Sequence, residues 1–218
     1  MMKNAKEYVG KDTYSMDDFV EIMKLLRIGC PWDRVQTHTS IRQNFIEEVY
    51  EAVDAIDKND KELLCEELGD VLMQVIFHTL MCEEDGDFTL SDVLLGVCRK
   101  LIVRHPHIFS DVKAEDADTV LTNWDAIKQK TKNQKSVKET VEDIPKSLPS
   151  LMRAQKTAKR ASKGEYKLSN RYESFSKEEA ERKIGEELFE ICSAAQSKKL
   201  DAEGILHKYC NEFLCRMN

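Results

Sequence analysis

The sequence is poor in residues that break helices, with four prolines and eight glycines among 218 residues. It also lacks stretches of alternating apolar and polar residues between hairpin turns, the pattern typical of strands. No apolar run approaches the roughly 20 residues of a membrane-spanning helix, and the first residues lack the apolar core of a signal peptide. We therefore expect an all-α, cytoplasmic protein with no membrane partner.

Paired cysteines at metal-binding spacing are missing too. The seven cysteines are scattered and form no CxxC pair, which argues against a zinc ribbon or a disulfide framework. The formal net charge is −7, which disfavours a nucleic-acid backbone as partner. What remains is an acidic, helical, intracellular chain.

Capping and turn residues divide this chain into predicted helices. Ser15 with Asp18 predicts a capping box, Ser40 a second helix cap, and Asn59 with Asp60 a turn between two helices. The predicted helices cover about residues 15 to 27, 40 to 58, 60 to 82, 89 to 105, 117 to 130, 148 to 162, 177 to 197 and 202 to 217.

The most informative pattern is a pair of acidic steps on consecutive predicted helices. These steps are Glu47, Glu48 and Glu51, then Glu66, Glu67 and Asp70. Helical periodicity places each set on one face. The opposite face of the first helix is apolar and should anchor it in a core, through Val49, Ala52, Val53 and Ile56. One step alone is weak evidence, but two facing steps would need cations to offset their repulsion. The pair therefore favours a hard-metal site over a solvated acidic face.

Several segments together resemble a known family. They are CPWDRVQTHTSI at 30 to 41, EEVYE at 47 to 51, EELGD at 66 to 70, KLIVRHPHIF at 100 to 109 and NWDAIK at 123 to 128. Through them, residues 15 to 130 closely resemble the MazG family of nucleoside triphosphate pyrophosphohydrolases. The resemblance implies an all-α fold of four-helix type, normally a homodimer. It also implies conversion of an NTP to NMP and pyrophosphate with Mg²⁺ or Mn²⁺, a reaction suited to nucleotide-pool house-cleaning.

The resemblance also implies roles for the acidic residues. The metal ligands would be Glu48, Glu51, Glu67 and Asp70. For Glu47 and Glu66 three roles stay open, namely binding a further ion, holding a water or orienting the nucleophile. The mechanism we expect is attack of a metal-activated water on the α-phosphorus, with pyrophosphate leaving.

Other residues are implied to contact the substrate. Lys100 and Arg104 share one helix face and occupy positions that contact phosphates in the family, although a solvated basic helix end is the alternative. Trp32, Gln36 and His38 lie in a segment that resembles the family's base- and sugar-facing loop. Trp124 and Lys128 belong to the trailing NWDAIK motif. For both tryptophans, core packing is the competing interpretation. The histidines flanking Pro106 are interpreted as a helix-end signature rather than a metal pair.

The C-terminal third resembles an incomplete second copy. We expect a catalytic domain at 1 to 133, a linker at 134 to 147 and a helical segment at 148 to 218. Residues 148 to 166 resemble the joint between two tandem catalytic domains of the family. Glu186, Glu187 and Glu190 match the first acidic step. The second acidic helix is missing, and Glu212 stands in place of the phosphate lysine. We predict a catalytically silent copy kept for packing or dimerisation.

Two alternatives to a general NTP pyrophosphohydrolase stay open. One is a protein of the same fold that senses nucleotides or binds partners without turnover, and the intact carboxylate set argues against it. The other is a more selective all-α pyrophosphatase of the dUTP or dCTP type. The CPWD and HPHIF segments argue against that second alternative.

Overall fold

The computed structural model describes residues 5–110 and 136–217, together with Val120, Trp124, Ile127 and Thr131. Within these residues every regular element is a helix, so the predicted all-α class is confirmed. None of the described helices is long and apolar enough to span a membrane. The predicted helix 117 to 130 falls largely outside the described residues, and so does Lys128.

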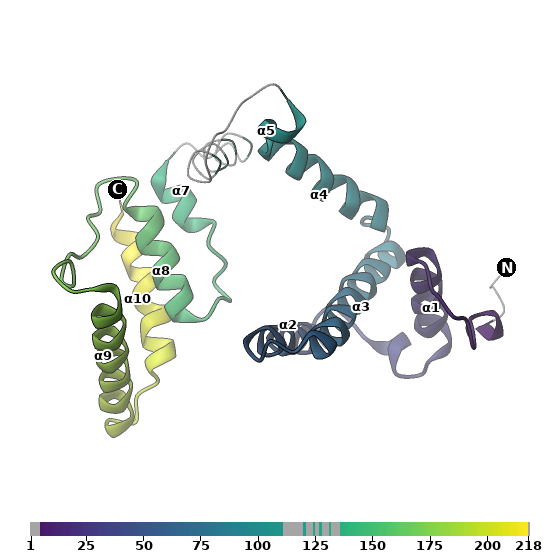
Figure 1. Ribbon diagram of the computed structural model, residues 1–218, viewed down its shortest axis with the longest axis horizontal. Coiled ribbons are helices and arrows are strands. Elements are labelled where there is room, and N and C mark those ends of the chain that lie inside the picture. The colour runs from purple at the N-terminus through teal and green to yellow at the C-terminus, as the bar shows by residue number, and fades with distance from the viewer. Residues whose placement is uncertain are drawn as a thin grey trace. The chain divides into compact units, whose positions relative to one another are not determined.

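The chain divides between Ile102 and Val103 into two compact units. The helices of the first unit are α1 (Met16–Gly29), α2 (Arg42–Asp57), α3 (Lys61–Asp85) and most of α4 (Leu90–Arg104), which crosses the boundary. The short helix α5 (Pro106–Phe109) follows the boundary and belongs to the second unit. Two short 3₁₀ helices, η1 (Ala5–Tyr8) and η2 (Asp33–Val35), lie on either side of α1 in the sequence. Helices α2 and α3 lie side by side (Figure 1).

Local hydrogen bonds explain where the first three helices begin. The capping box predicted at Ser15 is confirmed, and Asp60 caps α3 by accepting from two backbone N–H groups. Asn59 lies just before this cap with φ 54°, a left-handed conformation that asparagine tolerates and that closes the turn from α2. The prediction that Ser40 caps α2 is wrong. Its hydroxyl instead donates to the Thr37 carbonyl and the Gln36 side chain, and α2 begins without a side-chain cap.

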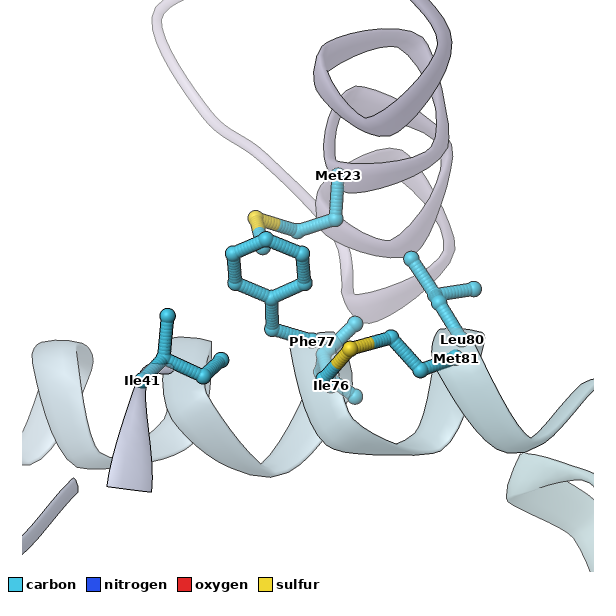
Figure 2. Packing of buried hydrophobic residues seen from close by; sticks show 6 residues of the cluster. All are labelled: Met23, Ile41, Ile76, Phe77, Leu80 and Met81. Carbon is cyan, nitrogen blue, oxygen red and sulfur yellow. The ribbon is translucent and has the colours of Figure 1, made fainter. Parts of the chain in front are cut away.

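The core of the first unit lies between α1 and the C-terminal half of α3. Met23 of α1 packs against Phe77 and Leu80 of α3, and Ile41 closes the cluster from the start of α2 (Figure 2). These side chains are at most 5% exposed. Fully burying each such side chain stabilises the fold by about 1.5–3 kcal/mol. The packed core therefore holds the C-terminal half of α3, while the acidic step occupies its N-terminal half.

The second unit is a separate helical assembly. Its further described helices are α7 (Val137–Glu142), α8 (Ser150–Ala161), α9 (Lys177–Ser197) and α10 (Ala202–Arg216), and α8 lies beside α10 (Figure 1). The predicted bounds of α9 are confirmed. The predicted linker at 134 to 147 is in part a packed helix, because Val141 of α7 and the following Ile144 are buried against Ala161. A polar composition concealed these two core residues.

Candidate metal centre

Helices α2 and α3 form an antiparallel hairpin whose register decides which acidic residues meet. Phe45 lies against His78, with ring centroids 5.4 Å apart. One turn further along α2, Glu48 faces Asp70, and Glu51 faces Glu67. The two helices approach closely because Ala55, which is fully buried, presents only a methyl group to the interface. The two acidic steps are therefore face to face, as the pairing of the steps predicted.

Three carboxylates converge in this hairpin. Oxygens of Glu48, Glu67 and Asp70 all lie within 4.8 Å of one another, and this is the metal-capable cluster found among the described residues. Glu67 is 8% exposed, whereas the other two are half-buried. Carboxylate oxygens are the ligands that hard cations such as Mg²⁺ prefer, and a half-open site leaves room for water and phosphate oxygens. The donor set therefore fits Mg²⁺ or Mn²⁺.

Burial and the crowding of negative charge raise the pKa values of two of these groups. Burial is the main cause that raises the pKa of Glu48, followed by the charge of Asp70, while a hydrogen bond from Gln74 acts in the opposite direction. The pKa of Glu67 is raised by burial first, then by the charges of Glu51 and Asp70. In the described part of the chain no Lys or Arg forms an ion pair with the three clustered carboxylates. A bound cation would remove this repulsion.

The remaining acidic residues of the two steps lie around this cluster. Glu51 is exposed and lies outside the group of three, although its charge acts on Glu67. Glu47 is exposed and accepts a hydrogen bond from the Gln43 amide at 3.4 Å. Glu66 is exposed. The structure thus brings together three of the four expected ligands and leaves the fourth beside them.

The apolar face of α2 corrects one expectation. Val49, Val53 and Ile56 are 44%, 45% and 57% exposed, so they do not anchor α2 in the core of a single chain. Only Ala52 of the predicted anchor is buried. The physical reason is that α2 turns its carboxylates and small residues toward α3, which leaves the large apolar side chains on the outer face.

One arginine holds the loop that precedes α2. The Arg27 guanidinium donates from Nη1 to the carbonyl oxygens of Asp33 at 2.5 Å and Gln36 at 2.9 Å. Its Nε donates to Glu84 of α3 at 2.9 Å. Trp32, in the same loop, is 56% exposed and is not part of the core described above. The loop is therefore fixed at its backbone while its indole faces outward.

Gln36 and His38 both make contacts within the protein. The Gln36 amide donates to the Trp32 carbonyl at 2.9 Å, and its oxygen accepts from Ser40. The His38 ring stacks on His78 with the two Nδ1 atoms 2.7 Å apart, and its Nε2 lies 3.5 Å from the Cys82 sulfur. These contacts tie the loop to α3.

Gln74 and His78 were missed by sequence reasoning, although a signal existed. Both follow Asp70 at intervals of four, so Glu67, Asp70, Gln74 and His78 form one polar stripe along α3. Arg27 was also missed. Its partners are backbone carbonyls of a loop, and no side-chain pattern reports them.

The basic residues of α4 are exposed or bonded elsewhere. Lys100 is exposed, and none of the ion pairs in the described residues joins it to an acid of α2 or α3. The Arg104 guanidinium lies 5.1 Å from the ring centroid of Trp124, a cation–π geometry. Two residues expected to meet the substrate thus contact each other.

A family model and several known proteins that match this chain all point to one family. Residues 36–109 match the family model described as the MazG nucleotide pyrophosphohydrolase domain. A nucleoside triphosphate pyrophosphohydrolase/pyrophosphatase MazG of Thermotoga maritima is 35% identical over 216 residues, which cover 92% of this chain and 83% of that protein. A nucleoside triphosphate pyrophosphohydrolase of Escherichia coli (strain K12) is 45% identical over 148 residues, which cover 66% of this chain and 56% of that protein.

Other relatives are longer than the matched region. An uncharacterized protein of Bacillus subtilis (strain 168), YabN, is also 45% identical over 148 residues, but the match covers 30% of that protein. The chain thus spans between about a third and about half of the length of these last two relatives.

Proposed function

The chain belongs to the MazG family of nucleotide pyrophosphohydrolases, and on that premise we propose that it hydrolyses nucleoside triphosphates to nucleoside monophosphates and pyrophosphate. The observation that carries the proposal is the convergence of Glu48, Glu67 and Asp70 inside the segment that the family model matches. NTPs are held in the cytoplasm, and that is where we propose the protein acts.

Four carboxylates of the hairpin would hold Mg²⁺, or Mn²⁺ in its place. Glu48, Glu67 and Asp70 offer clustered oxygens, and Glu51 lies beside them. When bound, the cation supplies neutralisation of phosphate charge and activation of a water toward the α-phosphorus. The exposed Glu47 and Glu66 are the available groups for orienting that water or accepting its proton.

Residues outside the hairpin would bind the rest of the nucleotide. Lys100 and Arg104 carry the positive charge suited to a triphosphate. Trp32 exposes an indole that can stack on any base, which supports broad base tolerance. Trp124, Lys128, Gln36 and His38 complete the proposed substrate contacts, with Gln36 and His38 acting through the loop that they hold.

A homodimer is the second part of the proposal. The outer face of α2 exposes an apolar stripe, formed by Ile46, Val49, Val53 and Ile56, and Leu68 of α3 is 56% exposed. Burying this stripe against a second copy would remove it from water. Light scattering tests this directly. We expect dimers for the wild type and monomers for Val53→Asp, and a monomeric wild type would refute the dimer.

Product analysis tests the activity. The protein is incubated with each NTP and dNTP plus Mg²⁺, and the products are identified by chromatography. NMP with pyrophosphate supports the proposal, whereas NDP with phosphate refutes it. Glu51→Gln and Asp70→Asn each remove one charge with little change in volume, and we expect both to abolish turnover without loss of helical structure. Full activity in either variant would overturn the ligand assignment.

A further inference from the structure

Gln74 is a buried amide that the proposed chemistry leaves unexplained. It lies one turn beyond Asp70 on α3 and is 5% exposed. Its oxygen, Oε1, is buried and has no hydrogen-bond partner within the described part of the chain. A buried acceptor without a partner costs about 1–3 kcal/mol, so such a group requires an explanation.

The position of Gln74 supplies that explanation. Its spacing of four from Asp70 and seven from Glu67 places it on the same face of α3 as two of the clustered carboxylates. Across the hairpin its side chain is close enough to Glu48, the third member of the cluster, to lower the pKa of that carboxyl through hydrogen bonding. Only the amide nitrogen can donate to a carboxylate. Oε1 is therefore the atom of this amide that remains available as an acceptor.

We propose that Gln74 is a positioning residue of the metal centre, which orients Glu48 through its N–H group and accepts a hydrogen bond at Oε1 from the hydration shell of the cation. Mg²⁺ and Mn²⁺ keep several waters when they bind to proteins, and these waters are donors. Partners of this kind orient the ligands, and their loss typically lowers metal affinity about 10–100-fold. The inference rests on the proposed metal-dependent function and identifies a residue that supports it.

The test measures Mn²⁺ binding without nucleotide, so that it does not depend on turnover. Electron paramagnetic resonance reports the concentration of free Mn²⁺ during a titration of the protein. Gln74→Met keeps the length of the side chain and removes both polar functions. We expect its dissociation constant for Mn²⁺ to rise about 10-fold, with the helical circular dichroism unchanged.

Thr79 offers a matched control on the same helix. It is 4% exposed, and its hydroxyl donates to the Val75 carbonyl at 2.8 Å within α3. Thr79→Val therefore perturbs a polar group at a similar depth that does not face the cluster. We expect this variant to change the melting temperature in EDTA and to leave the Mn²⁺ dissociation constant unchanged.

The possible outcomes separate this inference from the function on which it rests. If the wild type binds no Mn²⁺, the proposed function fails together with the inference. If the wild type binds Mn²⁺ and Gln74→Met binds it equally well, only the role of Gln74 is overturned. An equal loss of affinity in Gln74→Met and Thr79→Val would also overturn it, because the effect would then be structural.

A second variant decides the matter if Gln74→Met does not fold. Gln74→Glu keeps the shape of the side chain but faces Glu48 with a second carboxylate. We expect a lower melting temperature than wild type in EDTA and a larger rise on adding Mn²⁺, because the cation then offsets more repulsion. A wild-type melting temperature under both conditions would show that residue 74 does not act on the cluster.

Discussion

The acidic steps of α2 and α9 have the same spacing but different partners. In α2, Glu48 meets Asp70 and Glu67 of a neighbouring helix, and among the described residues no basic side chain pairs with these three. In α9, Glu187 pairs with Arg171 at 2.7 Å, and Glu186 pairs with Arg182 at 2.5 Å. The carboxylates clustered around α2 have no basic partner among the described residues, whereas two carboxylates of the α9 step are neutralised by arginines of the same chain.

The same contrast extends to neighbouring groups. Glu187 also accepts a hydrogen bond from the Tyr172 hydroxyl, and this bond is the main cause that raises the pKa of Tyr172. On α10, Arg216 pairs with Glu212 at 3.6 Å rather than standing free for a phosphate. Spacing within one helix therefore does not identify a metal site. The partner helix decides, because it supplies either further carboxylates or neutralising cations.

Charge removal at matched positions should give the largest effect. Glu67→Gln should lower turnover more than about 100-fold, a larger loss than outer-shell substitutions cause, whereas Glu187→Gln should leave turnover unchanged. Both are measured as pyrophosphate release with Mg²⁺. Because the raised pKa of Glu67 shows that its ionised form is disfavoured in the folded state, Glu67→Gln should also melt higher than wild type in EDTA. A loss of activity in Glu187→Gln would contradict the difference proposed between the α2 and α9 steps.

Loosening the loop beside the hairpin should give the next largest effect. Arg27→Met keeps the aliphatic stem but removes the hydrogen bonds to Glu84 and to two loop carbonyls. We expect the free energy of unfolding to fall by about 2 kcal/mol, and KM for NTP to rise more than kcat falls because the Trp32 loop is released. Urea denaturation and steady-state kinetics measure these quantities. The matched control is Arg34→Met on the same loop, an exposed residue, and an equal effect there would refute the role of Arg27.

Acidification should weaken the first unit through the histidine pair. Burial and the charge of His38 lower the pKa of His78 from 6.5, so the unfolded chain takes up a proton that the folded chain resists. The free energy of unfolding should therefore fall as the pH drops through about 6.5, and more so in wild type than in His78→Gln. Glu48 and Glu67 act in the opposite direction, since their raised pKa values favour protonation in the folded state.

The contribution of Glu48 and Glu67 is the same in wild type and in His78→Gln, so it cancels when the two are compared. Urea denaturation at several pH values measures the difference, and His107→Gln serves as the control with a wild-type profile. Parallel curves for wild type and His78→Gln would show that the pair does not titrate with unfolding.

Breaking the ion pair of the C-terminal step should give the smallest effect. Arg171→Met frees Glu187, but both side chains are exposed, at 66% and 39%. Exposed ion pairs contribute about 0–1 kcal/mol, so the free energy of unfolding should fall by less than 1 kcal/mol and turnover should stay unchanged. Mg²⁺-dependent activity gained or lost in this variant would contradict a silent C-terminal step.

The sequence predicted those parts of the fold that depend on local contacts. The capping box at Ser15, the turn at Asn59 and Asp60 and the bounds of α9 depend on residues only a few positions apart. The prediction of a cap at Ser40 was wrong because its hydroxyl oxygen accepts from the backbone N–H of Thr37 instead. The packed helix α7 was not predicted, because Val141 becomes a core residue only through its contact with Ala161 of α8.

The site was predictable to the extent that helical phase determines it. Glu48, Glu67 and Asp70 follow from the spacing of the two steps, and Gln74 lies on the same phase. The exposure of Val49 and Val53 was not predictable, because helical phase shows which residues share a face but not which face meets α3. The anchoring of the Trp32 loop by Arg27 depends on backbone carbonyls and left no pattern in the sequence.

The tight turn between α2 and α3 has a consequence for the order of folding. Glu48 and Glu67 are only nineteen positions apart, so assembling the carboxylate cluster closes a short loop at low entropic cost. Proteins dominated by such short-range contacts fold quickly, and N-terminal segments fold first during synthesis. The nascent chain can thus form the hairpin that carries the carboxylate cluster once α3 has left the ribosome, before the C-terminal unit has been made.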